Sequence, residues 1–193
     1  MSLQSDASER TFTRALVVDD HPLFCDALLL MLKSLTDVSD ARTASTLTEA
    51  FQTVEGGFKP DIIFLDLNLP DVDGLDGLVR LRNNSIAPIA VVSSMVGNRI
   101  VTSAIRAGAS GFIPKHSQRE VFAQAIDSMR KGHIFVPEDY VLLDDGQLGT
   151  TTKPDVFARI STLTNQQARI LQLICEGKLN KQIAYDLSMS VVI

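Results

Sequence analysis

Short apolar runs alternate along the first part of the chain with stretches in which apolar residues recur at helical spacing. Five runs have the length of a strand, at residues 15–18, 38–44 (the weakest), 62–67, 89–92 and 112–114. Strands that alternate with helices are typical of a parallel sheet wound by βαβ crossovers. We therefore expect an α/β fold with a five-stranded, doubly wound parallel sheet that is complete by about Lys131.

Several helix starts can be recognised between these runs. Pro22 suits a first helical position, and an apolar stripe at helical spacing follows it, formed by Phe24, Ala27, Leu28, Met31, Leu32 and Leu35. Two more helices are predicted by the capping boxes Thr46-x-x-Glu49 and Ser117-x-x-Glu120, in which hydroxyl and carboxylate satisfy free backbone N–H groups. Further helices are expected after Gly74 and over residues 98–106.

The pattern changes beyond residue 132. Periodicity is lost over residues 133–161, a stretch that contains two prolines and two glycines. Helical spacing returns at Thr164, which forms a capping box with Gln167, and Gly177 is placed to end that helix. A short helix is expected after it, over residues 180–187. We therefore expect a first domain over residues 12–132, a linker over 133–161 and the start of a helical domain over 162–193.

Composition narrows the class of protein. The chain has 45% hydrophobic and 21% charged residues, which is ordinary for a globular protein. It has no signal-peptide core and no apolar run long enough to span a membrane, so we expect a cytoplasmic protein. Residues 1–136 carry 13 basic and 16 acidic side chains, and residues 137–193 carry 5 and 7. Neither part is a basic patch, so charge alone does not predict DNA binding.

The chemistry is concentrated at the predicted strand ends. Carboxylate, hydroxyl and ammonium groups stand there, in Asp19–Asp20, Asp66, Ser93–Ser94 and Lys115. In an open parallel sheet these ends meet at one edge, which is where ligands bind. Clustered carboxylates need a counter-charge, and hard oxygen ligands favour Mg²⁺. A carboxylate beside such a metal can accept a phosphoryl group.

The spacing of these residues resembles the receiver domains of response regulators over about residues 14–131. The resemblance rests on LVVDDHP (16–22), FLDLNLPDVDG (64–74), VVSS (91–94) and GASGFIPK (108–115). It implies a flavodoxin-like (CheY-like) fold whose Asp66 accepts a phosphoryl group from a sensor histidine kinase. The resemblance also implies a Mg²⁺ site. Asp20 and Asp66 would bind the ion directly, Asp19 would bind it through water, and Asn68 would bind it with its backbone carbonyl.

The resemblance also assigns roles to three further side chains. Ser93 would hydrogen-bond the phosphoryl group, and Lys115 would form an ion pair with it. Phe112 would be the switch aromatic. On phosphorylation Ser93 would move toward the phosphoryl group and Phe112 would repack. His21 stands beside two acids, but we give it no chemical role, because Asp-Asp-His is a common local pattern in the subfamily. Such a protein is a signalling switch and not an enzyme, and it is expected to form a phosphorylation-dependent homodimer.

The segment 163–184 looks like the opening of a helix-turn-helix domain of the LuxR/FixJ type. In such domains a further helix enters the major groove of DNA. We expect that helix to start where the chain stops at Ile193. DNA is therefore an expected partner of the full-length protein and not of this chain. Together the two resemblances imply a transcription-regulating response regulator of the NarL/FixJ class.

Two other classes of function remain open at this point. Clustered aspartates with a lysine also occur in haloacid-dehalogenase-type phosphatases, but those need two aspartates separated by one residue on the first strand, where this chain has the adjacent pair Asp19–Asp20. The chain could also be a receiver-type module that signals through protein–protein contacts without DNA. Promoter binding by a full-length protein separates this last class from a transcription regulator.

Overall fold

A computed structural model describes residues 10–143 of the 193-residue chain. The expected helix-turn-helix segment and the part of the expected linker beyond residue 143 lie outside the described residues. Five strands alternate with five helices, in the order β1 (Arg14–Val18), α1 (Pro22–Leu35), β2 (Asp40–Ala44), α2 (Leu47–Glu55), β3 (Ile62–Leu65), α3 (Asp76–Asn84), β4 (Ile89–Ser93), α4 (Asn98–Arg106), β5 (Gly111–Pro114) and α5 (Arg119–Arg130). Each of the predicted strands is present.

All strand pairs are parallel, and the strands lie side by side in the order β2-β1-β3-β4-β5. The order reverses direction between β1 and β3, which makes the carboxyl edge there a topological switch point. β2 is an edge strand whose residues are largely exposed, and this explains why its apolar signal in the sequence is weak. The expectation of a five-stranded, doubly wound parallel sheet is confirmed.

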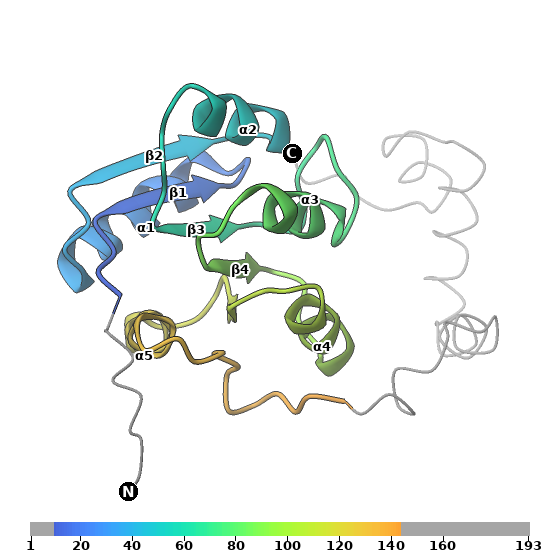
Figure 1. Cartoon of the computed structure of the whole chain (residues 1–193). Coiled ribbons are helices and arrows are strands. Elements are labelled where there is room, and N and C mark those ends of the chain that lie inside the picture. Colours follow the sequence, from blue (N-terminus) through green and yellow to red (C-terminus); the bar gives the residue numbers. More distant parts are fainter. Residues whose placement is uncertain (1–9, 144–193) are drawn as a thin grey trace, which may run out of the picture. The chain divides into compact units, whose positions relative to one another are not determined.

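The sheet separates two apolar cores, because successive residues of a strand point to opposite faces. One core joins Leu16, Ile63, Val91 and Phe112 to α2, α3 and α4. The other joins their strand neighbours, such as Val17, Phe64 and Ile113, to α1 and α5. Figure 1 shows α1 and α5 on one side of the sheet and the other three helices on the opposite side. Strands buried on both faces explain the continuous apolar runs.

The helix starts agree with the sequence at Pro22, Thr46 and Asn98 and differ at Ser117. Pro22 is the first residue of α1. The Thr46 hydroxyl accepts a hydrogen bond from the Glu49 backbone N–H at 3.0 Å. At Ser117 the prediction of a capping box was wrong, since Gln118 is the N-cap of α5 and makes no side-chain cap bond. The Ser117 N–H donates instead to the Pro114 carbonyl at 2.9 Å, in a turn that delays the helix.

The described part of the chain contains no helix that is both long enough and apolar enough to cross a bilayer.

Candidate functional site

The carboxyl ends of β1 and β3 bring two buried aspartates to the same edge of the sheet. Val18 pairs with Leu65 at the ends of these strands, and Asp19 and Asp66 are the next residues of each chain segment. The Asp66 N–H donates to the Val18 carbonyl at 2.9 Å. Asp19 is 4% exposed and Asp66 is 3% exposed. Two buried carboxylates at one edge require a positive partner, since burial without one is costly.

Lys115 is that partner. It follows β5, where its N–H donates to the Ser93 carbonyl at the end of β4, at 3.0 Å. Its Nζ lies 2.7 Å from Asp19 Oδ2 as an ion pair and donates a hydrogen bond to Asp66 Oδ2 at 2.8 Å. Burial acts to lower the pKa of the Lys115 ammonium, but the hydrogen bonds and charges of the two aspartates outweigh burial and raise this pKa.

One oxygen of this group has neither a hydrogen bond nor an ion pair among the described residues. Asp66 Oδ1 is buried and accepts no hydrogen bond within the described part of the protein. A buried carboxylate oxygen is normally hydrogen-bonded, so a missing bond at this position indicates a place for an external group. The carboxylates of Asp19, Asp20 and Asp66 each offer an oxygen within 4.8 Å of the others. Hard oxygen donors at this spacing fit Mg²⁺.

His21 lies closer to the acidic cluster than the sequence analysis suggested. Its Nδ1 lies 2.7 Å from Asp20 Oδ1 and 3.1 Å from Asp19 Oδ1, with the imidazole side chain 60% exposed. The His21 N–H also donates to Asp19 Oδ1 at 2.9 Å. These contacts fix the Asp19 carboxylate at the start of α1. The adjacency of His21 to two acids was the available signal, but a sequence does not say that the ring turns toward them.

The other predicted site residues lie around this edge. Ser93 is the last residue of β4, fully buried, and its Oγ accepts a hydrogen bond from the Met95 N–H at 3.1 Å. Phe112 is fully buried on β5, within the core that contains α4. Asn68 is exposed in the loop after β3, between the buried Leu67 and Leu69. The phosphoryl, metal and switch roles of these residues stay predictions.

Two residues of α1 contact the site in a way that the sequence did not predict. The Lys115 Nζ lies 4.9 Å from the centre of the Phe24 ring, a distance at which a cation is attracted to an aromatic face. The thiol of the buried Cys25 donates to the Asp19 carbonyl at 3.4 Å. The sequence placed Phe24 in the apolar stripe of the first helix, and its contact with Lys115 depends on tertiary packing. A small hollow of about 190 Å³, lined in part by Asp19, Asp20 and Cys25, opens beside the cluster.

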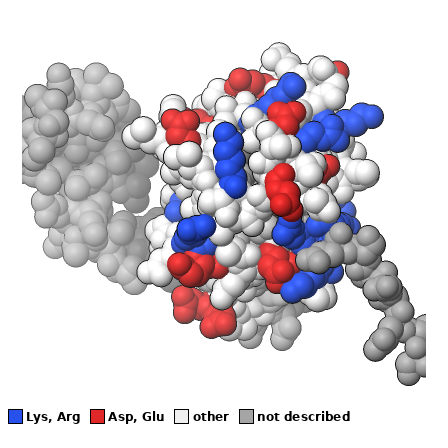
Figure 2. All heavy atoms as spheres, turned by 90° about the vertical axis from the view of Figure 1, so that its left-hand side faces the viewer, with Lys and Arg blue, Asp and Glu red and all other residues white. Residues whose placement is uncertain are grey.

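Away from the carboxyl edge, acidic and basic side chains are mixed on the protein surface. On the face drawn in Figure 2, Lys and Arg side chains of the described residues are interspersed with Asp and Glu side chains. This face carries no continuous basic area within those residues, in agreement with the charge distribution of the sequence. Among the described residues, acids with the spacing of metal ligands gather at the carboxyl edge, in Asp19, Asp20 and Asp66.

Family models match two parts of the chain. The response regulator receiver domain matches residues 15–127, and the bacterial regulatory proteins of the luxR family match residues 161–191. The chain belongs to the NarL/FixJ family of response regulators. Because both family models match, the family is one of transcription regulators with a LuxR-type DNA-binding domain. This disfavours the phosphatase alternative and a receiver module without DNA binding.

Individual relatives of this response regulator support the assignment. The glycerol metabolism activator of Pseudomonas putida is 32% identical over 92% of this chain and 82% of its own length. The nitrate/nitrite response regulator protein NarL of Escherichia coli K12 is 30% identical, over 91% of this chain and 81% of its own. The crystal structure of a LuxR family DNA-binding response regulator from Silicibacter pomeroyi matches with a TM-score of 0.59 and 31% identity, over 66% of this chain and 99% of that one.

Proposed function

We propose that this response regulator accepts a phosphoryl group on Asp66 from a sensor histidine kinase, with Mg²⁺, and thereby regulates transcription through its LuxR-type region. The observation that carries the proposal is the unequal environment of the two Asp66 carboxylate oxygens. Lys115 holds Oδ2, whereas Oδ1 is buried and has no partner within the described residues. A carboxylate held at one oxygen and free at the other is oriented for nucleophilic attack.

The transfer step is a displacement at phosphorus. An Asp66 carboxylate oxygen forms a bond to the phosphorus of a kinase phosphohistidine, and the bond between phosphorus and the imidazole nitrogen breaks. The leaving nitrogen keeps the electron pair and takes up a proton. The Lys115 ammonium neutralises charge on the phosphoryl oxygens, and the Ser93 hydroxyl, whose oxygen accepts from the Met95 N–H before the transfer, has a proton to donate to them. Positioning and charge neutralisation of this kind dominate phosphoryl transfer.

Mg²⁺ would be held by the carboxylates of Asp20 and Asp66, by Asp19 through water and by the backbone carbonyl of Asn68. The three carboxylates and one ammonium leave a local excess of negative charge, which supports a divalent cation at this place. When bound, the ion supplies positive charge to the phosphoryl oxygens. Because the site offers few protein ligands, the ion is expected to keep several waters and to bind weakly.

Asp66→Asn tests the phospho-acceptor. We expect acetyl phosphate and Mg²⁺ to add one phosphoryl mass to the wild-type chain and none to the variant, as measured by intact-mass spectrometry. Asp61→Asn is the matched control, because Asp61 immediately precedes β3 as Asp66 follows it, and it should label like the wild type. A stable Mg²⁺-dependent adduct on Asp66→Asn would refute the assignment.

Asp20→Ala tests the metal separately. This variant should lose both Mg²⁺ binding, measured by titration calorimetry, and labelling with acetyl phosphate. Labelling at the wild-type rate would remove Asp20 from the metal site while leaving Asp66 as acceptor.

DNA and a second copy of the protein are the proposed partners of the output step. The luxR-family match at residues 161–191 supports DNA as the target. Sedimentation with and without the phosphoryl mimic beryllofluoride tests self-association. Binding of a chain that carries a complete LuxR-type domain to promoter DNA, compared with random DNA at one salt concentration, tests sequence recognition. Equal affinity for both DNAs in either state would contradict the proposed output.

A further inference from the structure

Residues 133–143, which we call the strap, lie against the receiver after α5 has ended. The strap first meets β5, the edge strand of the sheet. The Phe135 N–H donates to the Ser110 carbonyl at 3.1 Å, and the Phe112 N–H donates to the Phe135 carbonyl at 3.0 Å. Phe135 thus pairs with Gly111 as a parallel bridge. A Cβ on Gly111 would lie 3.3 Å from Phe135 Cβ, a tight contact, so glycine favours this close approach. We call this contact the anchor.

The strap then meets α4. The Val141 N–H donates to Asn98 Oδ1 at 3.2 Å, and the Leu143 N–H donates to Thr102 Oγ1 at 2.9 Å. The Leu143 carbonyl accepts a bond from the Arg106 guanidinium at 2.9 Å. These three bonds, which we call the clasp, engage successive turns of α4. Side-chain groups hold backbone groups here, so the clasp does not follow from helix or sheet formation alone.

Apolar contacts accompany both attachments. Phe135 packs against the core shared by α1 and α5, whereas Val136 and Tyr140 pack against the core shared by α2, α3 and α4. The strap therefore passes from one face of the sheet to the other around the β5 edge. It also covers backbone groups of an edge strand that would otherwise be open to pairing with another chain.

Both attachments are linked to the site at Asp66 by short paths. Phe112, the predicted switch aromatic, lies on β5 and bonds the anchor directly. The clasp begins at Asn98, the first residue of α4, which follows the short loop after Ser93. The Ser93 hydroxyl oxygen holds this loop through the Met95 N–H at 3.1 Å. A Ser93 hydroxyl drawn toward a phosphoryl group loses this bond, which alters the loop that positions the first turn of α4.

We propose that the strap is a built-in sensor of the Asp66 site: phosphorylation opens the clasp on α4 while the anchor on β5 stays closed. The proposal rests on the proposed function of Asp66. The clasp is the weaker attachment, since its Val141 and the neighbouring Leu142 are exposed and local opening selects segments with few buried contacts. Opening frees residues 138–143, which precede in the sequence the region that matches the luxR family.

Amide hydrogen exchange of the whole chain with Mg²⁺, with and without beryllofluoride, tests the opening. Beryllofluoride should speed exchange at Val141 and Leu143 by about tenfold, the effect of losing roughly one net hydrogen bond. Exchange at Phe112 and Phe135 should stay as slow as before. Equal or slower exchange at residues 141 and 143 would overturn the proposal.

Variants test the clasp without any phosphoryl mimic. Thr102→Val removes the acceptor of the Leu143 N–H and should speed exchange at that residue. Thr53→Val is the matched control, because the Thr53 hydroxyl makes the same bond to a helical carbonyl four residues earlier, in α2, as Thr102 makes in α4. Since Thr102 is buried, the exposed Asn98→Ala provides a second variant, which should speed exchange at Val141. No acceleration in either clasp variant would show that the strap is not held by these groups.

The backbone of residues 93–97 separates the failure of the strap from the failure of the proposed function. If beryllofluoride changes exchange there but not at residues 141 and 143, the strap proposal is wrong and the site proposal stands. If beryllofluoride changes neither region, the proposed switch at Asp66 fails, and the opening of the clasp fails with it.

Discussion

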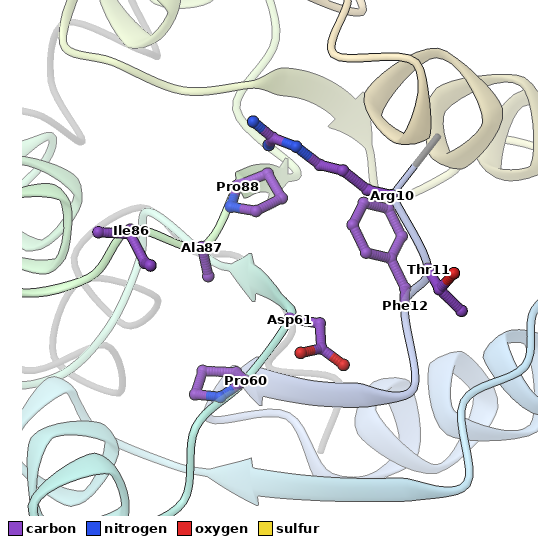
Figure 3. A pocket seen from close by; sticks show the side chains of 8 residues that line it. All are labelled: Arg10, Thr11, Phe12, Pro60, Asp61, Ile86, Ala87 and Pro88. Atoms are coloured by element: carbon purple, nitrogen blue, oxygen red, sulfur yellow. The ribbon is translucent and has the colours of Figure 1, made fainter. Parts of the chain in front are cut away.

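The two ends of β3 carry aspartates in opposite situations. Asp61 precedes the strand, and its Oδ2 accepts hydrogen bonds from the Thr13 N–H at 3.0 Å, the Thr13 hydroxyl at 2.7 Å and the Arg14 N–H at 2.9 Å. Asp66 follows the strand, and its Oδ1 accepts none within the described residues although it is buried. Figure 3 shows the Asp61 carboxylate beside Thr11 and Phe12, at the amino edge of the sheet.

The difference separates a structural carboxylate from a reactive one. Asp61 uses its Oδ2 to hold the start of β1 against the start of β3, and its Oδ1 lies 3.9 Å from the Arg14 guanidinium. Asp66 leaves an oxygen available at an edge where a lysine and two further acids gather. A hollow lies at the amino edge too, lined by residues that include Arg10 and Pro60, but it lacks the cluster of acids. The two ends differ in an oxygen that is both buried and without a hydrogen bond, since the Asp66 side chain is 2% exposed and the Asp61 side chain is 28% exposed.

The largest effect is expected from Lys115→Met. Removing the ammonium leaves the Asp19 and Asp66 carboxylates buried without compensation, and breaking a buried ion pair in this way costs about 3–5 kcal/mol. The free energy of unfolding in urea, without Mg²⁺ and at neutral pH, measures it.

Lys131→Met is the control for Lys115→Met. The ion pair of Lys131 with Asp127 joins side chains that are 51% and 57% exposed, and such surface pairs contribute about 0–1 kcal/mol. Similar losses in the two variants would mean that the carboxyl edge is not a special electrostatic environment.

Asp61→Ala should destabilise the protein by about 1–3 kcal/mol, because it leaves three donors without their acceptor. Partial burial acts to raise the pKa of Asp61, but the bonds from Thr13 and Arg14 and the Arg14 charge outweigh burial and lower it. The stabilisation is therefore present above the ordinary carboxyl pKa of about 3.9 and is lost as the pH falls through the lowered value. Urea unfolding from neutral to acidic pH should show the wild type and the variant converging, while labelling of Asp66 stays unchanged.

The sequence was informative where local rules determine the outcome. Apolar runs predict the strands, and the shared direction of parallel strands is enough to bring Asp19, Asp66 and Lys115 to one edge. Contacts that depend on tertiary packing were not predictable. The Ser117 box fails because a turn bonds Ser117 to Pro114, and residues 133–143, expected to belong to a linker, pack on β5 through the space that Gly111 leaves.

Mg²⁺ should stabilise the folded protein only where the carboxylates at the carboxyl edge are intact. An ion that binds only the folded protein stabilises it by about 1.4 kcal/mol at ten times its dissociation constant. We expect this gain for the wild type and for Asp61→Ala, and not for Asp66→Asn. Thermal unfolding with Mg²⁺, compared with the same ionic strength of Na⁺, measures the gain. An equal gain in Asp66→Asn would place the ion away from the carboxyl edge.

The smallest effect is expected from Asp71→Asn. This variant tests whether a position after β3 is enough to make a carboxylate reactive, or whether the unpartnered oxygen of Asp66 is needed. Asp71 lies beyond β3 in the sequence, as Asp66 does, yet its carboxylate accepts from the Leu47 N–H, the Thr48 N–H and the Thr48 hydroxyl, each at 2.9 Å. Asp71 is exposed. Some desolvation acts to raise the pKa of its carboxyl, but these hydrogen bonds from the first turn of α2 outweigh it and lower this pKa. Its stabilisation is therefore lost as the pH falls through the lowered pKa, as for Asp61.

An acid that caps a helix start contributes about 1 kcal/mol, and an asparagine at position 71 retains one acceptor oxygen, so the measured loss should be no more than that. Labelling of Asp66 and the Mg²⁺-dependent stabilisation should both be unchanged. If Asp71→Asn behaved like Asp66→Asn in either measurement, position along the chain after β3, and not the unfilled oxygen of Asp66, would be what makes a carboxylate reactive in this protein.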